Sequence, residues 1–239
     1  MLAGKRRTLQ ENKKLGYSLA FIAGAINAGG FMAVSQYTSH MTGIISLAAD
    51  NIVIGNWLLA TSMLSYILCF IFGAATTTIL VIWGRNRHLN SCYALPIAIE
   101  SALLLVFGVF NNKLEPFYII SLLCFLMGLQ NAVITKISNT TIRTTHITGM
   151  STDIGIELGR IIYSFMDRNL SRVLYNKDKI IMHLSIVSLF LFGGIVGAFG
   201  FKYSGFSFVL PLATYLFLLA FPSINRDLKI YKYLYSNSK

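Results

Sequence analysis

The sequence predicts an all-α integral membrane protein with about six membrane-spanning helices and two further semi-polar helices. Hydrophobic residues make up 55% of the 239 residues and charged residues only 12%. A soluble domain of this size has more polar residues with which to cover its surface. Long apolar stretches recur along the chain, and its two halves share motifs in the same order. Together these observations indicate that the chain has lipid as its solvent.

Six stretches have about the length that a helix needs to cross a hydrocarbon core. They are residues 16–34, 57–83, 92–110, 117–137, 181–201 and 206–222. Two further stretches, 41–55 and 147–165, are only half apolar and carry charged residues such as Asp50 and Arg160. We expect these two to be broken, re-entrant or interfacial helices. Whether they cross the membrane decides between six and eight spans.

The positive charges favour six spans, because short cytoplasmic loops are enriched in Lys and Arg. With six spans, both termini and the loop of residues 84–91 face the cytoplasm, and eight spans would move that loop outside. The cytoplasmic positive charges then include Lys5, Arg6, Arg7, Arg85, Arg87, Arg168 and Arg172. We therefore expect cytoplasmic tails at 1–15 and 223–239 around one membrane domain, 16–222.

The net charge of +11 is concentrated at the ends of the apolar segments, so it indicates topology and not a nucleic-acid partner. Cys69, Cys92 and Cys124 have neither metal-ligand spacing nor the pairing of a disulfide framework. No phosphate-binding loop, nucleophile elbow or catalytic carboxylate pair is present, so we expect no enzyme activity, metal or cofactor. The expected partner is the lipid bilayer.

Four short motifs of the first half recur, in order, in the second. Residues 38–43 read TSHMTG and residues 144–149 read TTHITG, which is the sharpest echo. GAINA at 24–28 recurs as GLQNA at 128–132. Two weaker echoes are IFGA at 71–74 with IVGA at 195–198, and LPIA at 95–98 with LPLA at 210–213. The chain therefore divides into repeat one, 16–110, and repeat two, 117–222.

Three crossings in each half make an odd number, which would place the second half upside down relative to the first. Inverted repeats of this kind are typical of secondary transporters. The charge pattern and the repeat thus predict the same 3+3 arrangement.

The repeated stretches 24–43 and 128–149, and above all the RTTHITG of residues 143–149, resemble the YoaK-like family of bacterial inner-membrane proteins. That family is described as membrane-embedded and of unknown function. The resemblance implies a multi-pass protein of the bacterial inner membrane, and it supplies neither a substrate nor catalytic residues.

Asn27 and Asn131 stand near the ends of two spans, where an amide that cannot reach water needs partners within the protein. They could coordinate a solute or ion near the axis between the halves. They could equally hydrogen-bond to backbone groups where the helices break.

His40 and His146 each precede Thr-Gly at the expected start of a semi-polar helix. Two helix starts meeting from opposite sides would form a polar site that attracts anions, with Thr42 and Thr148 beside them. The histidines could carry protons or anchor re-entrant turns. Arg143 has no counterpart in the first half, so a preference for an anion would come from one side only.

Three carboxylates are candidates for ion or proton coupling. Glu100 lies alone in the middle of an apolar span, where an ionisable group is costly and by default a functional candidate. Asp153 and Glu157 share one helical face with Arg160. These two could instead be hydrated near the cytoplasmic interface.

The sequence thus favours a small secondary transporter or channel for a small polar or anionic solute. Its expected substrate-binding residues are Asn27, His40, Thr42, Asn131, Arg143, His146 and Thr148. The alternative is a non-transporting membrane receptor or assembly partner, in which the repeat would serve only the stability of the fold.

Overall fold

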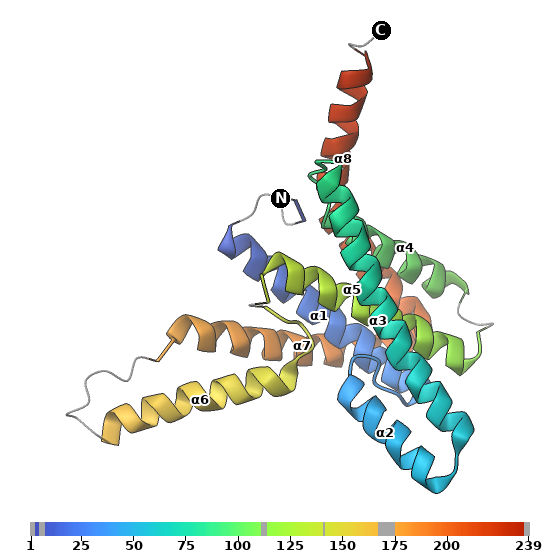
Figure 1. Cartoon of the computed structure of the whole chain (residues 1–239), viewed down its shortest axis with the longest axis vertical. Helices are drawn as coiled ribbons and strands as arrows, with labels where there is room; N and C mark the ends of the chain where they lie inside the picture. Colours follow the sequence, from blue (N-terminus) through green and yellow to red (C-terminus); the bar gives the residue numbers. More distant parts are fainter. Residues whose placement is uncertain (1–2, 5–7, 111–113, 141, 167–174, 237–239) are drawn as a thin grey trace.

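A computed structural model describes residues 3–4, 8–110, 114–140, 142–166 and 175–236, with side chains up to residue 233 (Figure 1). All regular secondary structure in these ranges is helical. The prediction of an all-helical fold is therefore confirmed for this part of the chain. Lys5, Arg6, Arg7, Arg168 and Arg172, which entered the charge argument, lie outside the described residues.

Each predicted segment coincides with one helix of the structure. The helices are α1 (Leu9–Val34), α2 (Met41–Ile54), α3 (Trp57–Asn86), α4 (Ala94–Phe110), α5 (Pro116–Ile137), α6 (Ile147–Met166), α7 (Lys177–Ser204) and α8 (Val209–Ser236), with the short 3-10 helix η2 (Gly205–Phe208) before α8. The two semi-polar segments are α2 and α6. The main difference is at the C-terminus, where α8 continues past Pro222 and extends beyond the other helices (Figure 1).

Four helical stretches are long and apolar enough to cross a membrane: Leu9–Val34, Trp57–Asn86, Pro116–Ile137 and Lys177–Tyr233, the last of which contains α7, η2 and most of α8. Helix α4 is apolar but shorter, as is α2. Large apolar side chains lie on the outside of these helices, including Leu58, Phe72 and Phe192. Exposed apolar surface on this scale indicates a multi-pass membrane protein.

Local sequence explains where the helices begin. Thr8 and Glu11 form a capping box at the start of α1, in which each side chain bonds to the other residue's backbone N–H. Asn56 and Asn176 are the caps of α3 and α7. In each case the side-chain oxygen accepts from the backbone N–H three residues later. The starts of α3 and α7 are therefore built alike.

Glycines bring α1 and α7 into backbone contact. A Cβ on Gly24 would overlap the carbonyl oxygen of Phe190, and a Cβ on Gly193 would overlap that of Phe21. Gly197 faces the backbone of α1 in the same manner. Only glycine permits such close approach, which is the usual role of small residues between membrane helices.

The α3 and α5 helices approach through a matching set of glycines. Gly128 faces the carbonyl of Phe70, as Gly24 faces that of Phe190. Gly73 faces the carbonyl of Phe125, as Gly193 faces that of Phe21. These contacts match Gly73 with Gly193, one helical turn before Gly197, which was the partner that the sequence echo suggested. The better echo is FIFGA at 70–74 with FLFGG at 190–194.

Helices α4 and α8 form a third pair, linked by a hydrogen bond of 2.7 Å from the Ser101 hydroxyl to the carbonyl of Ala213. Beyond Pro222, α8 reaches the turn between α3 and α4. There the Asp227 carboxylate accepts from Asn90 N–H and Nδ2 at 3.1 and 2.9 Å, and from Ser91 N–H at 2.7 Å. These bonds explain why the helix continues past the apolar span.

We predict that Gly24→Ala destabilises the protein by about 1–3 kcal/mol, because the added Cβ forces α1 away from the backbone of α7. The measurement is the thermal unfolding midpoint of purified protein in detergent. Gly155→Ala is the matched control, since nothing lies within 4 Å of a Cβ at that position on α6. Equal midpoints for the two variants would contradict the close packing of α1 on α7.

We also predict that Asp227→Ala lowers stability at neutral pH and loses this effect in acid. Burial raises the pKa of Asp227, but the hydrogen bonds from Ser91 and Asn90 outweigh burial, so that the pKa lies below its ordinary value of 3.8. A lowered pKa stabilises the fold above pH 3.8, and this contribution disappears as the pH falls through the folded-state pKa. The stability difference between wild type and variant should therefore be constant above pH 5 and shrink below 3.8. A constant difference throughout would mean that the carboxylate charge is not involved.

Candidate functional site

A cavity of about 700 Å³ lies between the two halves and is lined by residues of both, so we call it the shared cavity. Its lining includes all seven residues that the sequence suggested as substrate-binding: Asn27, His40, Thr42, Asn131, Arg143, His146 and Thr148. The remaining lining residues are Tyr37, Ser39, Met41, Phe70, Thr135, Thr145, Ile147 and Phe190. Residues more than 100 positions apart in the chain thus meet at one place.

The two asparagines hold the turns that lead into α2 and α6. Asn27 Oδ1 accepts from both the N–H and the hydroxyl of Ser39, each at 3.0 Å. Asn131 Oδ1 accepts from the Thr145 hydroxyl at 2.8 Å and the Thr144 hydroxyl at 3.4 Å. These bonds agree with the interpretation in which the amides satisfy the chain where helices break. Both side chains also line the cavity, so this role leaves the solute-binding prediction standing.

The spacing of His40 to Gly43, and of His146 to Gly149, has a direct structural reason. Each imidazole ring folds back over the first turn of its own helix and occupies the place where the Cβ of a larger residue would lie. Neither ring could take this position if the third residue after it carried a side chain. The glycine therefore leaves room for the histidine at the helix start, on the wall of the shared cavity.

The starts of α2 and α6 come together at this cavity, and the two helices diverge away from it (Figure 1). The side chain of His40 makes no capping hydrogen bond to the first turn of α2. Free N–H groups at a helix start favour a negative charge. Arg143 adds a full positive charge, and it forms no ion pair with a carboxylate of the described residues.

A second cavity of about 430 Å³ shares Arg143 and His146 with the first. Its far end contains Asp153 of α6 and His183 of α7. Lys179 Nζ lies 3.0 Å from Asp153 Oδ1, and His183 Nδ1 lies 3.8 Å from Asp153 Oδ2. His183 is 5% exposed, and its Nδ1 has no hydrogen-bond partner among the described residues. Polar groups thus continue from the shared cavity along the α6–α7 interface.

The other two coupling candidates have different surroundings. Glu157 is buried, accepts from the Asn176 N–H at 2.9 Å and pairs with Arg160 at 2.9 Å, so it ties α6 to the start of α7. Glu100 is fully buried in α4, and neither carboxyl oxygen has a hydrogen-bond partner among the described residues. Glu100 lines neither the shared cavity nor the second one.

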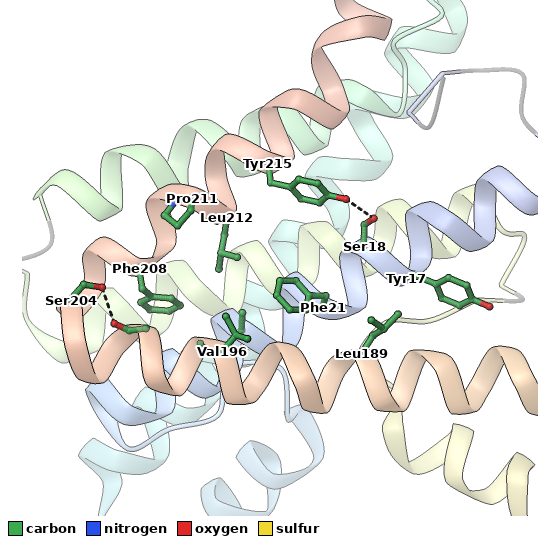
Figure 2. A pocket seen from close by; sticks show the side chains of 13 residues that line it. Tyr17, Ser18, Phe21, Leu189, Val196, Ser204, Phe208, Pro211, Leu212 and Tyr215 are labelled. Carbon is green, nitrogen blue, oxygen red and sulfur yellow. Dashed lines mark hydrogen bonds between the residues drawn. The ribbon is translucent and has the colours of Figure 1, made fainter.

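An apolar groove of about 720 Å³ lies between α1, α7 and α8 (Figure 2). Phe21, Leu189 and Phe208 contribute much of its wall, and the hydroxyls of Ser18 and Tyr215 meet across one end at 2.9 Å. Tyr215 occupies the position that matches Glu100 in the echo of 95–98 with 210–213. The groove has few polar groups, so it is no candidate site for a polar solute.

Sequence reasoning missed several residues of this region. His183, which no sequence motif singled out, is buried in α7 beside Asp153. Phe70 and Phe190 line the shared cavity from matching positions, and the FIFGA and FLFGG echo could have revealed them. Gln130, one residue before Asn131, is fully buried with no hydrogen-bond partner for its amide among the described residues. No sequence signal distinguished it.

A family model described as protein of unknown function (DUF1275) matches residues 15–221, so the chain belongs to this family. This finding agrees with the resemblance to membrane proteins of unknown function, although it does not carry the YoaK-like name. No curated protein and no solved structure matches the chain.

We predict that Asn27→Ala destabilises the protein by about 1–3 kcal/mol, because it removes the acceptor of two hydrogen bonds and leaves the Ser39 N–H without a partner. Thermal unfolding in detergent measures the effect. Asn51→Ala is the control, since Asn51 is half-buried and its side chain bonds only within its own helix. A loss no larger than that of the control would show that the turn before α2 does not depend on Asn27.

Proposed function

We propose that this member of the DUF1275 family is a secondary transporter or channel for a small polar solute, and that the shared cavity is its solute site. The proposal rests on one observation. The seven polar residues that the sequence suggested, drawn from both halves of the chain, line a single cavity between those halves. Sites of this kind, between two halves of a membrane protein and beside helix starts, are typical of transporters.

We further propose that the halves form a 3+3 inverted repeat with six spans and cytoplasmic termini. The matching contacts support the repeat. A glycine faces the carbonyl of a phenylalanine in both α1–α7 and α5–α3, an asparagine accepts from a hydroxyl of the following turn, and a histidine ring lies against a glycine in each half. The charge pattern supports the orientation, because it places Arg85 and Arg87 inside. The bacterial inner membrane is the expected location.

Coupling to protons or ions is assigned to Asp153, Glu157 and Glu100. Asp153 has the best position of the three, because it lines the cavity that adjoins the solute site. Glu157 and Arg160 would hold α6 in place for it. Glu100 would act at a distance, through the packing of α4 on α8.

Labelling of introduced cysteines tests the function. We expect Thr42→Cys and Thr148→Cys, in a variant lacking the three native cysteines, to react with membrane-impermeant maleimide added from either side of the membrane. A transporter must expose its site to both sides in turn, whereas the alternative receptor or assembly partner needs no such exposure. Asn86→Cys is the topology control and should react only from the cytoplasm. If both cavity cysteines react from one side alone or not at all, the proposal that a solute is transported through this cavity is wrong.

A further inference from the structure

We infer that the solute of the shared cavity is a small organic anion, such as a carboxylate attached to an apolar body. This inference rests on the proposed function and specifies its substrate class. It follows from the charge, the hydrogen-bond donors and the size of the cavity.

The charge of the cavity lining is positive. Arg143 lines the shared cavity together with His40 and His146, and no Asp or Glu is among the lining residues. The carboxylates nearest along α6 already have partners, since Asp153 pairs with Lys179 and Glu157 pairs with Arg160. Arg143 therefore has no carboxylate to neutralise it within the described residues, and an anionic ligand would supply one.

Donors converge on the same place. Arg143 carries five N–H groups in a planar fork that suits a carboxylate or phosphate. The hydroxyls of Thr42 and Thr148 stand at the starts of α2 and α6, and both line the cavity. The N–H groups of the first turn of α2, which the His40 side chain leaves uncapped, add a favourable field for negative charge.

Size and apolar walls distinguish an organic anion from an inorganic one. A volume of about 700 Å³ lies within the range of about 300–1,000 Å³ that is usual for organic ligands. Phe70 and Phe190 face it from matching positions on α3 and α7, with Met41 and Ile147 beside them. An inorganic ion would leave these walls uncovered.

The lining is also polarised. Counting from the echoed histidines, the position of Arg143 in the second half corresponds to Tyr37 in the first. Both line the cavity, and Tyr37 stacks on Phe31 with ring centroids 4.2 Å apart. One side thus offers a cation and the other an aromatic phenol. A ligand with one charged end and one apolar end fits this arrangement.

Thermal unfolding of the purified full-length protein tests the inference with three ligands that share a ring and differ in charge: phenylacetate, phenylacetamide and 2-phenylethylamine. A ligand that binds only the folded state raises the unfolding midpoint in proportion to its saturation. We expect phenylacetate to raise it and the neutral and cationic analogues to leave it unchanged. Inorganic phosphate should have a weaker effect than phenylacetate.

Arg143→Gln should weaken phenylacetate binding by at least about tenfold, as expected when a charged partner is lost. Arg226→Gln is the matched control, because Arg226 is exposed on α8 and lies outside the shared cavity. It should bind phenylacetate as the wild type does.

Stabilisation by phenylacetamide or 2-phenylethylamine that equals that of phenylacetate would overturn the anion inference and leave the proposed function intact. No stabilisation by phenylacetate, or an effect that Arg143→Gln does not change, would also overturn it. If vesicles of phosphatidylglycerol stabilise the protein through Arg143 and phenylacetate does not, the cavity holds a lipid headgroup and the inference is wrong. The cysteine labelling described above decides the proposed function separately.

Discussion

The rest of the structure depends on the backbone contact between crossed helices of opposite halves. Glycines let α1 lie directly on α7, and α5 directly on α3, with carbonyl oxygens where side chains would otherwise separate them. In lipid, where the hydrophobic effect does not drive helices together, such packing is a main source of association. Because α1 carries Asn27 and α5 carries Asn131, these contacts also set where the two amides stand. The amides hold the turns before α2 and α6, and those turns bring His40 and His146 to the shared cavity. Packing and site are thus one connected arrangement.

The halves match in their framework and differ in their chemistry. Counting from the echoed histidines and from the asparagine caps, Asp153, Lys179 and His183 correspond to Leu47, Leu59 and Met63. The α6–α7 interface is therefore charged where the α2–α3 interface is apolar. Arg143 is likewise charged, whereas Tyr37, its counterpart in the first half, is uncharged. A site between equal halves would have no preferred end, whereas these substitutions give the α6–α7 side its own polar cavity. The two closest glycine contacts of each half, and the asparagine caps of α3 and α7, are by contrast alike.

Much of the fold and of the shared cavity could be predicted from the sequence, because lipid permits few kinds of backbone structure. Apolar length marked the helices, and charged residues within 41–55 and 147–165 marked the two semi-polar ones. The exact echo of His-x-Thr-Gly pointed to the residues of the shared cavity. The part of α8 beyond Pro222 was missed, because the bonds of Asp227 to Asn90 and Ser91 join positions about 137 residues apart. His183 was missed because a single histidine near a span end carries no pattern, and only the packing of α6 on α7 reveals its neighbour Asp153.

The placement of each imidazole over a glycine has a consequence for how this motif can change. Replacing the glycine alone displaces the ring. A glycine in a helix costs about 1 kcal/mol relative to alanine, and replacing the histidine alone removes the ring packing that offsets this cost. The two positions are thus epistatic: the effect of either substitution depends on the residue at the other, and their free energies do not add. The same pair lines the shared cavity from both halves of the chain, so this coupling between the two positions occurs twice. Changing both residues of a pair together should therefore cost less free energy than the sum of the two single changes.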